Sequence, residues 1–347
     1  MKKTFFIILF AILLTLTASA SPETDAKDIM DKYDSSNAIE KAVENNDLSD
    51  LYKMLKESIT SKISILKNAA YLIGVTVILT VLKLLGVGSS SETVNIASIS
   101  AVAGITLIPG INAVGAVSEY LSVMSGFLTS FTPVFAGVMA ASGKVVTAST
   151  SAYIVLGFSS VASAAAGVIV IPLISLYLCL SLVSGLQNNN SLVPFSESVK
   201  KAVNLLLGLL LVLFSGLLSV KMLISGVGDS VTLRGVKFAV SSFVPIIGSA
   251  LGEAVAAAGS YVGVLSKTFG IFGILALIVF FLPVAAEILL WILTLTVSSS
   301  VADLLGNDKI SKVFGSVRTA FSVLWSITVC FFLMSIISVG LMLTLGG

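Results

Sequence analysis

The sequence predicts an all-α fold, a polytopic transmembrane helical bundle, and three observations support this prediction. Hydrophobic residues make up 56% of the 347 residues and charged residues only 11%, whereas an ordinary soluble domain carries roughly 25% charged residues. The mean hydropathy is +1.07. Several apolar stretches are long enough to cross a hydrocarbon core of about 30 Å at 1.5 Å per residue. We therefore expect lipid to surround most of the chain.

The charge and the residue types argue against several classes of partner and chemistry. The net charge is only +2 and the chain contains no histidine. Nucleic-acid binding needs a basic patch, and no Arg and Lys cluster interleaved with aromatic residues is present. Histidine is also the commonest metal ligand and the commonest base near neutral pH. We expect no nucleic-acid partner, no cofactor, no metal site and no catalytic residues.

Residues 1–20 have the pattern of a secretory signal peptide. Lys2 and Lys3 precede an apolar run over residues 5–14, and small residues then end at Ala20. Signal peptidase reads small residues at these positions, so cleavage is expected between Ala20 and Ser21. The alternative is an uncleaved anchor helix, and in both cases the next region starts on the far side of the membrane.

Residues 21–68 are expected to form an extracytoplasmic amphipathic helical region. Apolar residues recur there at three- and four-residue steps, which stacks them on one helix face. That face comprises Leu48, Leu51, Leu55, Ile59, Ile63 and Leu66, and the opposite face carries Asp50, Lys53, Lys56, Glu57 and Lys62. Such a helix lies on lipid headgroups or packs on a partner, or it is a solvated lead-in to the first span.

Residues 69–347 are predicted to be the transmembrane domain. Residues 69–87 form the first span, and residues 94–118 are interpreted as a broken or re-entrant piece because Pro109 and Gly110 interrupt them. Further apolar stretches lie at about 121–142, 152–185, 202–225, 238–258, 268–299 and 320–345. Five or six true crossings are expected from these lengths.

The transmembrane domain also resembles itself, which predicts an internal repeat with copies at 121–225 and 235–345. The segment 130–136 reads Ser-Phe-Thr-Pro-Val-Phe-Ala and the segment 242–248 reads Ser-Phe-Val-Pro-Ile-Ile-Gly. Ile171-Pro172 corresponds in the same order to Leu282-Pro283, and the segment 198–202 to the segment 316–320. Three landmarks in one order indicate a duplicated unit of about 110 residues, although chance similarity within an apolar alphabet is the alternative.

The two Ser-Phe-x-Pro segments are expected at the pore or packing centre of the protein. Only residues 238–252 separate Lys237 from Glu253, which is too short for a straight crossing. We therefore interpret both segments as half-helices or re-entrant hairpins broken at Pro133 and Pro245, because lipid cannot satisfy freed backbone groups and such segments must be enclosed. An ordinary proline kink within a spanning helix is the alternative.

Two carboxylates are candidate functional groups in this centre. Glu287 lies four residues after Pro283 in a run that is otherwise uncharged from residue 268 to residue 301. An ionisable group at membrane depth is expected to face a bundle interior, water or a partner. Glu253 either shares this role or lies at the membrane interface. Lys237 or Lys267 is expected to supply a counter-charge.

The sequence lacks a phosphate-binding loop. Gly137 and Gly143-Lys144-Val145 approach one, but the glycines are one residue too far apart and Val145 replaces the hydroxyl residue. If the protein takes part in energy-driven transport, a separate subunit must supply the ATPase.

Several ordered segments resemble the stage III sporulation protein AE family. They are residues 233–240, which lead into residues 243–248 and Ala250-Leu251, then Ala140-Ala141-Ser142-Gly143 and Leu305-Gly306-Asn307-Asp308. The signal peptide followed by a charged lead-in is also similar. The resemblance covers the chain from about residue 70 to its end.

The resemblance implies a non-enzymatic core subunit of a secretion-like feeding channel in the mother-cell membrane around the forespore. It implies other stage III sporulation subunits as partners, including a separate ATPase, and a forespore-side channel protein. The channel is required for late forespore gene expression. A stand-alone secondary transporter or permease is the alternative that repeats and broken helices would also suit, and an intramembrane enzyme is a third class.

Overall fold

The structure is a bundle of long α-helices. A computed structural model describes residues 49–84, 91–141, 144–187, 197–217 and 248–346. The helices are α4 (Ser49–Lys62), α5 (Ile65–Leu84), α6 (Ser91–Ala141), α7 (Val145–Ala165), a π-helical turn η1 (Ala166–Val170), α8 (Ile171–Gln187), a helix over 197–217, α10 (Gly248–Leu304) and α11 (Asp308–Gly346). The signal peptide, its cleavage site, Lys237 and Pro245 lie outside the described residues.

Six helical segments in the described part of the chain are long and apolar enough to cross a membrane. They are Tyr52–Val81, Ala97–Ala140, Val145–Leu180, Glu197–Leu217, Gly270–Leu304 and Asp308–Leu343. The mean hydropathy reaches 2.6 in Gly270–Leu304. The predicted all-α, multi-pass membrane fold is thereby confirmed, with six as the number of candidate spans.

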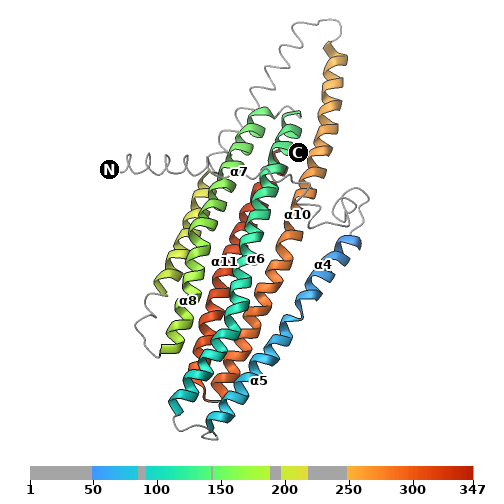
Figure 1. Ribbon diagram of the computed structural model, residues 1–347. Coiled ribbons are helices and arrows are strands. Elements are labelled where there is room, and N and C mark those ends of the chain that lie inside the picture. Colours follow the sequence, from blue (N-terminus) through green and yellow to red (C-terminus); the bar gives the residue numbers. More distant parts are fainter. Residues whose placement is uncertain (1–48, 85–90, 142–143, 188–196, 218–247, 347) are drawn as a thin grey trace, which may run out of the picture.

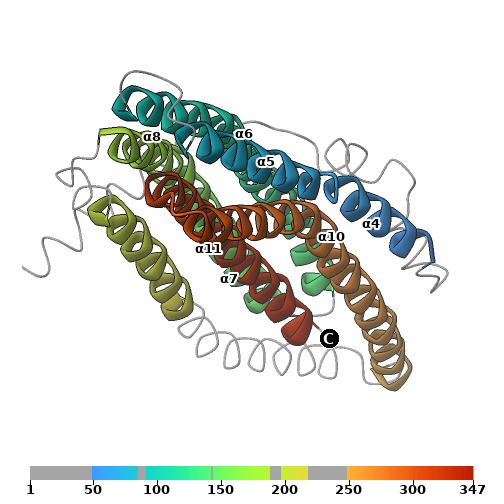
Figure 2. The same ribbon diagram turned by 90° about the horizontal axis from the view of Figure 1, so that it is seen from below.

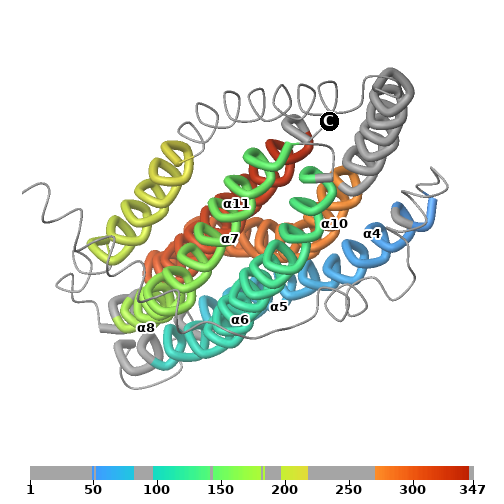
Figure 3. The backbone as a smooth tube through the Cα atoms, turned by 90° about the horizontal axis from the view of Figure 1, so that it is seen from above, coloured from blue at the N-terminus to red at the C-terminus, as the bar shows by residue number. Residues whose placement is uncertain are grey.

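Successive spans run in opposite directions, as Figure 1 shows. α10 and α11 form a central antiparallel hairpin that packs against α6, while α4 and α5 lie along α10. α7 packs on α6, and α8 packs on α11. The helix over 197–217 lies on the outside of the bundle (Figures 2 and 3), where Phe214 contacts Phe158 of α7 with ring centroids 4.5 Å apart.

The hairpin turn between α10 and α11 is a tight glycine cap. Gly306 has φ +68°, a left-handed conformation that glycine adopts without steric cost. The Asn307 N–H donates to the Ala302 carbonyl and the Gly306 N–H to the Asp303 carbonyl, which is the Schellman pattern that ends a helix. The Asn307 side chain, which is buried, donates to the Thr80 hydroxyl at 3.3 Å. The turn therefore fixes the lower end of α5 against the hairpin.

An aromatic column joins α6 to α10. Phe127, Phe131 and Phe135 follow each other along one face of α6, with neighbouring ring centroids 5.2 and 5.6 Å apart. Phe280 of α10 meets Phe127 edge-on at 5.6 Å. Phe131 lies against Gly273, where an added Cβ would be only 2.6 Å from the ring. Glycine at this position thus lets α10 approach α6 closely.

The interpretation of residues 94–118 and of Pro133 as broken or re-entrant pieces is wrong for the described copy. Pro109 and Pro133 both lie inside α6, which is one continuous helix of 51 residues. The sequence argument treated each proline as a break, yet a long helix tolerates proline when neighbouring helices pack around it. Pro133 therefore follows the alternative of a proline within a spanning helix.

A local distortion does occur beside Pro172. The turn η1 is π-helical, and the Ile171 N–H donates to the Ala166 carbonyl five residues earlier. A proline cannot donate to the carbonyl four residues before it, and a widened turn absorbs that irregularity. The corresponding Pro283 lies within α10. The internal repeat stays a prediction, because most of the segment 242–248 lies outside the described residues.

The helix α4 lies within residues 21–68, for which the extracytoplasmic amphipathic character stays a prediction. Leu55 and Ile59 of the predicted apolar face are half-buried, and Leu55 packs against the core. Ile63 and Leu66 of that face are exposed within this chain by 48% and 38%, whereas Ile65 is buried. The cause is a turn at residues 63–64, which shifts the helical phase and places Ile65 inside instead.

Candidate functional site

An ion pair between α4 and α10 lies at the centre of a polar site in the described bundle. The Lys62 ammonium lies 2.6 Å from a Glu287 carboxylate oxygen and donates a hydrogen bond to it. The exposed fraction of the side chain is 37% for Lys62 and 17% for Glu287. Lys62 is the last residue of α4, and Glu287 lies one helical turn after Pro283 in α10. The pair thus joins two segments that are 225 positions apart in the sequence.

Two cavities meet at this ion pair, and we call them together the polar cleft. The smaller cavity has a volume of about 180 Å³ and the larger one about 420 Å³. Lys62 and Glu287 line both. The smaller cavity is also lined by Ala116, Glu119, Tyr120, Phe280 and Pro283, and the larger one by Asn68, Pro109, Asn112 and Trp291. Both are large enough to hold several water molecules.

The ionised side chains explain why the cleft stands out in an apolar bundle. Lys62 carries one positive charge, while Glu119 and Glu287 each carry a negative charge, so these three formal charges sum to −1. Charged groups within a membrane protein are costly unless they pair or face water. A charge-assisted hydrogen bond and an adjoining polar cavity provide both conditions. The arrangement can hold a cationic group, water or a proton donor beside Glu287.

The structure places the predicted site residues in different parts of the molecule. Glu287 is 17% exposed, pairs with Lys62 and lines both cavities of the polar cleft. Pro133 is exposed on α6, about 21 Å along the helix from Glu119 at 1.5 Å per residue, so it is not part of the cleft. Glu253 belongs to the first part of α10, and its side chain lies outside the described ones.

The sequence reasoning missed Lys62 as the counter-charge of Glu287. It assigned this residue to the polar face of α4 and expected Lys237 or Lys267 instead, whose side chains are not described. The available signal was the position of Lys62 at the C-terminal end of the amphipathic segment, beside the first apolar run. Pairing it with Glu287 required knowing that α4 packs on α10.

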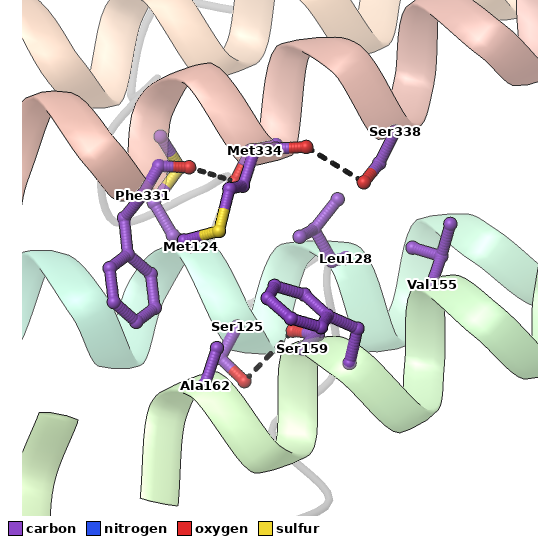
Figure 4. Close-up of a pocket in the computed structure, with 11 residues that line it drawn as sticks. Met124, Ser125, Leu128, Val155, Ser159, Ala162, Phe331, Met334 and Ser338 are labelled. Carbon is purple, nitrogen blue, oxygen red and sulfur yellow. Dashed lines mark hydrogen bonds between the residues drawn. The ribbon is translucent and has the colours of Figure 1, made fainter. Parts of the chain in front are cut away.

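A second cavity lies between α6, α7 and α11, and it has a different character (Figure 4). Its volume is about 20 Å³, enough for about one water molecule. The Ser159 hydroxyl donates to the Ser125 hydroxyl at 3.3 Å, and Ser335 and Ser338 donate to backbone carbonyls of their own helix. Its lining contains no ionisable side chain. We therefore take the polar cleft as the candidate functional site.

The described residues contain no group of three His, Cys, Asp or Glu side chains that could hold a metal ion. The cleft offers two carboxylates, and Lys62 already pairs with one of them.

Six helices long and apolar enough to cross a membrane, in the part of the chain that the structure describes, define a multi-pass helical membrane protein. Residues 25–346 match the stage III sporulation protein AE family, and the chain belongs to that family. A relative from Bacillus subtilis (strain 168), itself named stage III sporulation protein AE, is 27% identical over 273 residues, which cover 76% of this chain and 68% of the relative. No solved structure matches the chain.

One segment that carried the resemblance in the sequence has a clear structural role. Leu305-Gly306-Asn307-Asp308 forms the turn between α10 and α11, with Gly306 in the left-handed conformation and Asn307 anchored on Thr80. The turn requires glycine and a buried amide for physical reasons, which explains why these residue types stand together.

Proposed function

We propose that this protein is a non-enzymatic core subunit of a secretion-like feeding channel between the mother cell and the forespore. The observation that carries this proposal is the family match over residues 25–346 in a chain with six candidate membrane spans. In this proposal the protein resides in the mother-cell membrane around the forespore. Its function there is to sustain late forespore gene expression.

The proposed partners are those that the family resemblance implies, and the features of this chain are compatible with them. The sequence has no phosphate-binding loop, so a separate ATPase among the other stage III sporulation subunits would supply energy. A forespore-side channel protein would complete the path across the intermembrane space. Membrane lipid surrounds the apolar outer faces, on which large hydrophobic residues such as Ile78, Leu205 and Leu293 are exposed.

The experiment is deletion and complementation in the spore-forming host. Loss of the chain is expected to abolish a late forespore reporter after engulfment while earlier reporters stay active, and the full chain should restore it. Affinity purification of the tagged full chain from detergent-solubilised sporulating cells should recover other stage III subunits. Normal late expression without the chain would refute the proposal.

A stand-alone secondary transporter is a second candidate, because Pro109 and Pro283 line the polar cleft beside an ion pair. Transporters of that class use irregular helices near a charged site. Purified full chain in liposomes distinguishes the two functions. Ion-coupled solute uptake by this chain alone would favour the transporter.

A further inference from the structure

One turn and two helix prolines lie around the polar cleft. α4 and α5 are separated by the turn at residues 63–64, which holds the backbone through bonds such as Leu66 N–H to the Ile63 carbonyl at 2.9 Å. Pro109 of α6 lines the larger cavity and Pro283 of α10 lines the smaller one. A proline removes a helical hydrogen bond and permits bending at its position. Each of the three elements around the cleft can therefore bend there.

The described side chains of α4 are less buried than those of α5. Among the described side chains of α4, none is fully buried, and Met54 and Leu55 are only half-buried. In α5, by contrast, Leu72 and Thr76 are exposed by 2% and 0%, and Asn307 binds Thr80. Few buried apolar contacts mark an element that opens at low free-energy cost.

Lys62 stands where these two features meet. It is the residue just before the turn at 63–64, and its side chain crosses from α4 to Glu287 on α10. Glu287 is 17% exposed and would lose its partner if α4 moved away. Water in the two cavities could then hydrate its carboxylate, which removes much of the cost of separating the charges.

We propose that α4 is a hinged arm that closes the polar cleft, with the turn at residues 63–64 as its hinge and the Lys62–Glu287 ion pair as its latch. Breaking the latch releases α4 from α10 and exposes the smaller cavity to solvent. The opening is a property of this chain alone. That it controls passage through a channel rests on the function proposed above.

The test measures access to the smaller cavity in membranes that contain the full chain. Ala116 lines this cavity, and we replace it by cysteine (Ala116→Cys) in a background without Cys179 and Cys330. The rate at which a water-soluble maleimide labels this cysteine reports access to the cavity. Glu287→Gln removes the charge at nearly constant size and should raise the rate by roughly 5- to 30-fold, the effect of losing one or two kcal/mol of closure. The matched control is Asp303→Asn, because Asp303 is an exposed carboxylate of the same helix.

The reversed pair Lys62→Glu with Glu287→Lys keeps the attraction and should return the labelling rate to within about two-fold of the parent rate. Equal rates for Glu287→Gln, Asp303→Asn and the parent would overturn the proposal, as would a reversed pair that labels as fast as Glu287→Gln. The labelling needs no sporulation. If Glu287→Gln impairs the late reporter but does not label faster, the hinged-arm proposal is wrong and the channel function still stands. If Glu287→Gln labels faster but sporulates normally, the result supports the hinged arm and counts against the channel function.

Discussion

Substitution of Gly273 by alanine tests the close packing of α10 on α6. A Cβ added at Gly273 would lie 2.6 Å from Phe131 Cζ and 3.1 Å from Cε1 and Cε2. The Phe131 ring is 6% exposed and stacks on Phe127 and Phe135. It cannot move aside without displacing both neighbours. Since carbon atoms prefer separations of about 3.5–4.0 Å, the two helices must part by close to 1 Å or the aromatic column must shift.

The expected cost follows from two opposing terms. Overpacking a filled core costs about 1–3 kcal/mol, whereas replacing glycine by alanine within a helix gains up to about 1 kcal/mol. Gly115 of α6 provides the matched control, because an added Cβ there meets nothing within 4 Å. Gly115→Ala therefore gains helix propensity without a steric clash of the new Cβ. The free energy of unfolding of Gly273→Ala should lie below that of Gly115→Ala by about 1–3 kcal/mol, the full overpacking term.

The assay is reversible unfolding of both variants in the same detergent micelles, followed by helical circular dichroism. A third variant, Phe131→Leu, removes the ring tip and should make Gly273→Ala much less costly in a double-mutant cycle. If Gly273→Ala is as stable as Gly115→Ala, α10 does not approach α6 as described. If the cost persists unchanged with Phe131→Leu, it has another origin.

Three further outcomes are expected. Gly306→Ala should lower the free energy of unfolding by about 1–2 kcal/mol because alanine is strained at positive φ, while Gly306→Asn should be tolerated better; equal stability of the two variants would contradict the assigned turn. Asn307→Ala should lower the free energy of unfolding in the same assay by about 1–3 kcal/mol, because the buried Thr80 hydroxyl loses its hydrogen-bond donor. An unchanged free energy of unfolding would show that this hydrogen bond contributes nothing. Glu287→Leu should reduce sporulation efficiency more than Glu23→Leu, because it leaves Lys62 unpaired; equal tolerance would remove Glu287 from the site.

The sequence was sufficient for the class of fold because the physical signal is local. Composition and the length of each apolar run depend only on neighbouring residues, and they correctly predicted a multi-pass helical protein. The same local reasoning failed at Pro133, where it read a proline as a helix break. Whether a proline interrupts a helix depends on the helices packed around it, and this information is not present in the segment itself. The turn at residues 63–64 is a second feature that the periodic pattern of apolar residues did not reveal.

The candidate site shows the same division between local and distant information. Glu287 was identified from its isolation in an apolar run, which is visible in a single segment. Its partner Lys62 lies 225 positions away and looked like one charge among several on a solvated face. Only the packing of α4 on α10 brings the two together. A single sequence reveals that a buried charge needs a partner, but it does not reveal which residue supplies it.

The long helices explain why a charged cleft is compatible with this bundle. α6 has 51 residues and α10 has 57, so at 1.5 Å per residue they extend about 76 and 86 Å, against a hydrocarbon core of about 30 Å. Each carries a proline that lines the cleft, which provides a point at which so long a helix can bend relative to the bilayer.

The ion pair itself argues for movement at that point. The Lys62–Glu287 pair is partly buried, and a salt bridge withdrawn from water seldom stabilises a protein more than a well-packed apolar pair of similar size would, so stability alone gives little reason for it. An apolar pair could not separate into a water-filled cavity at low cost, because its hydrophobic contact would be lost without compensation. A charged pair can, because each group is hydrated after separation. The combination of a charged pair, adjoining cavities and helix irregularities is therefore better suited to opening and closing than to static packing.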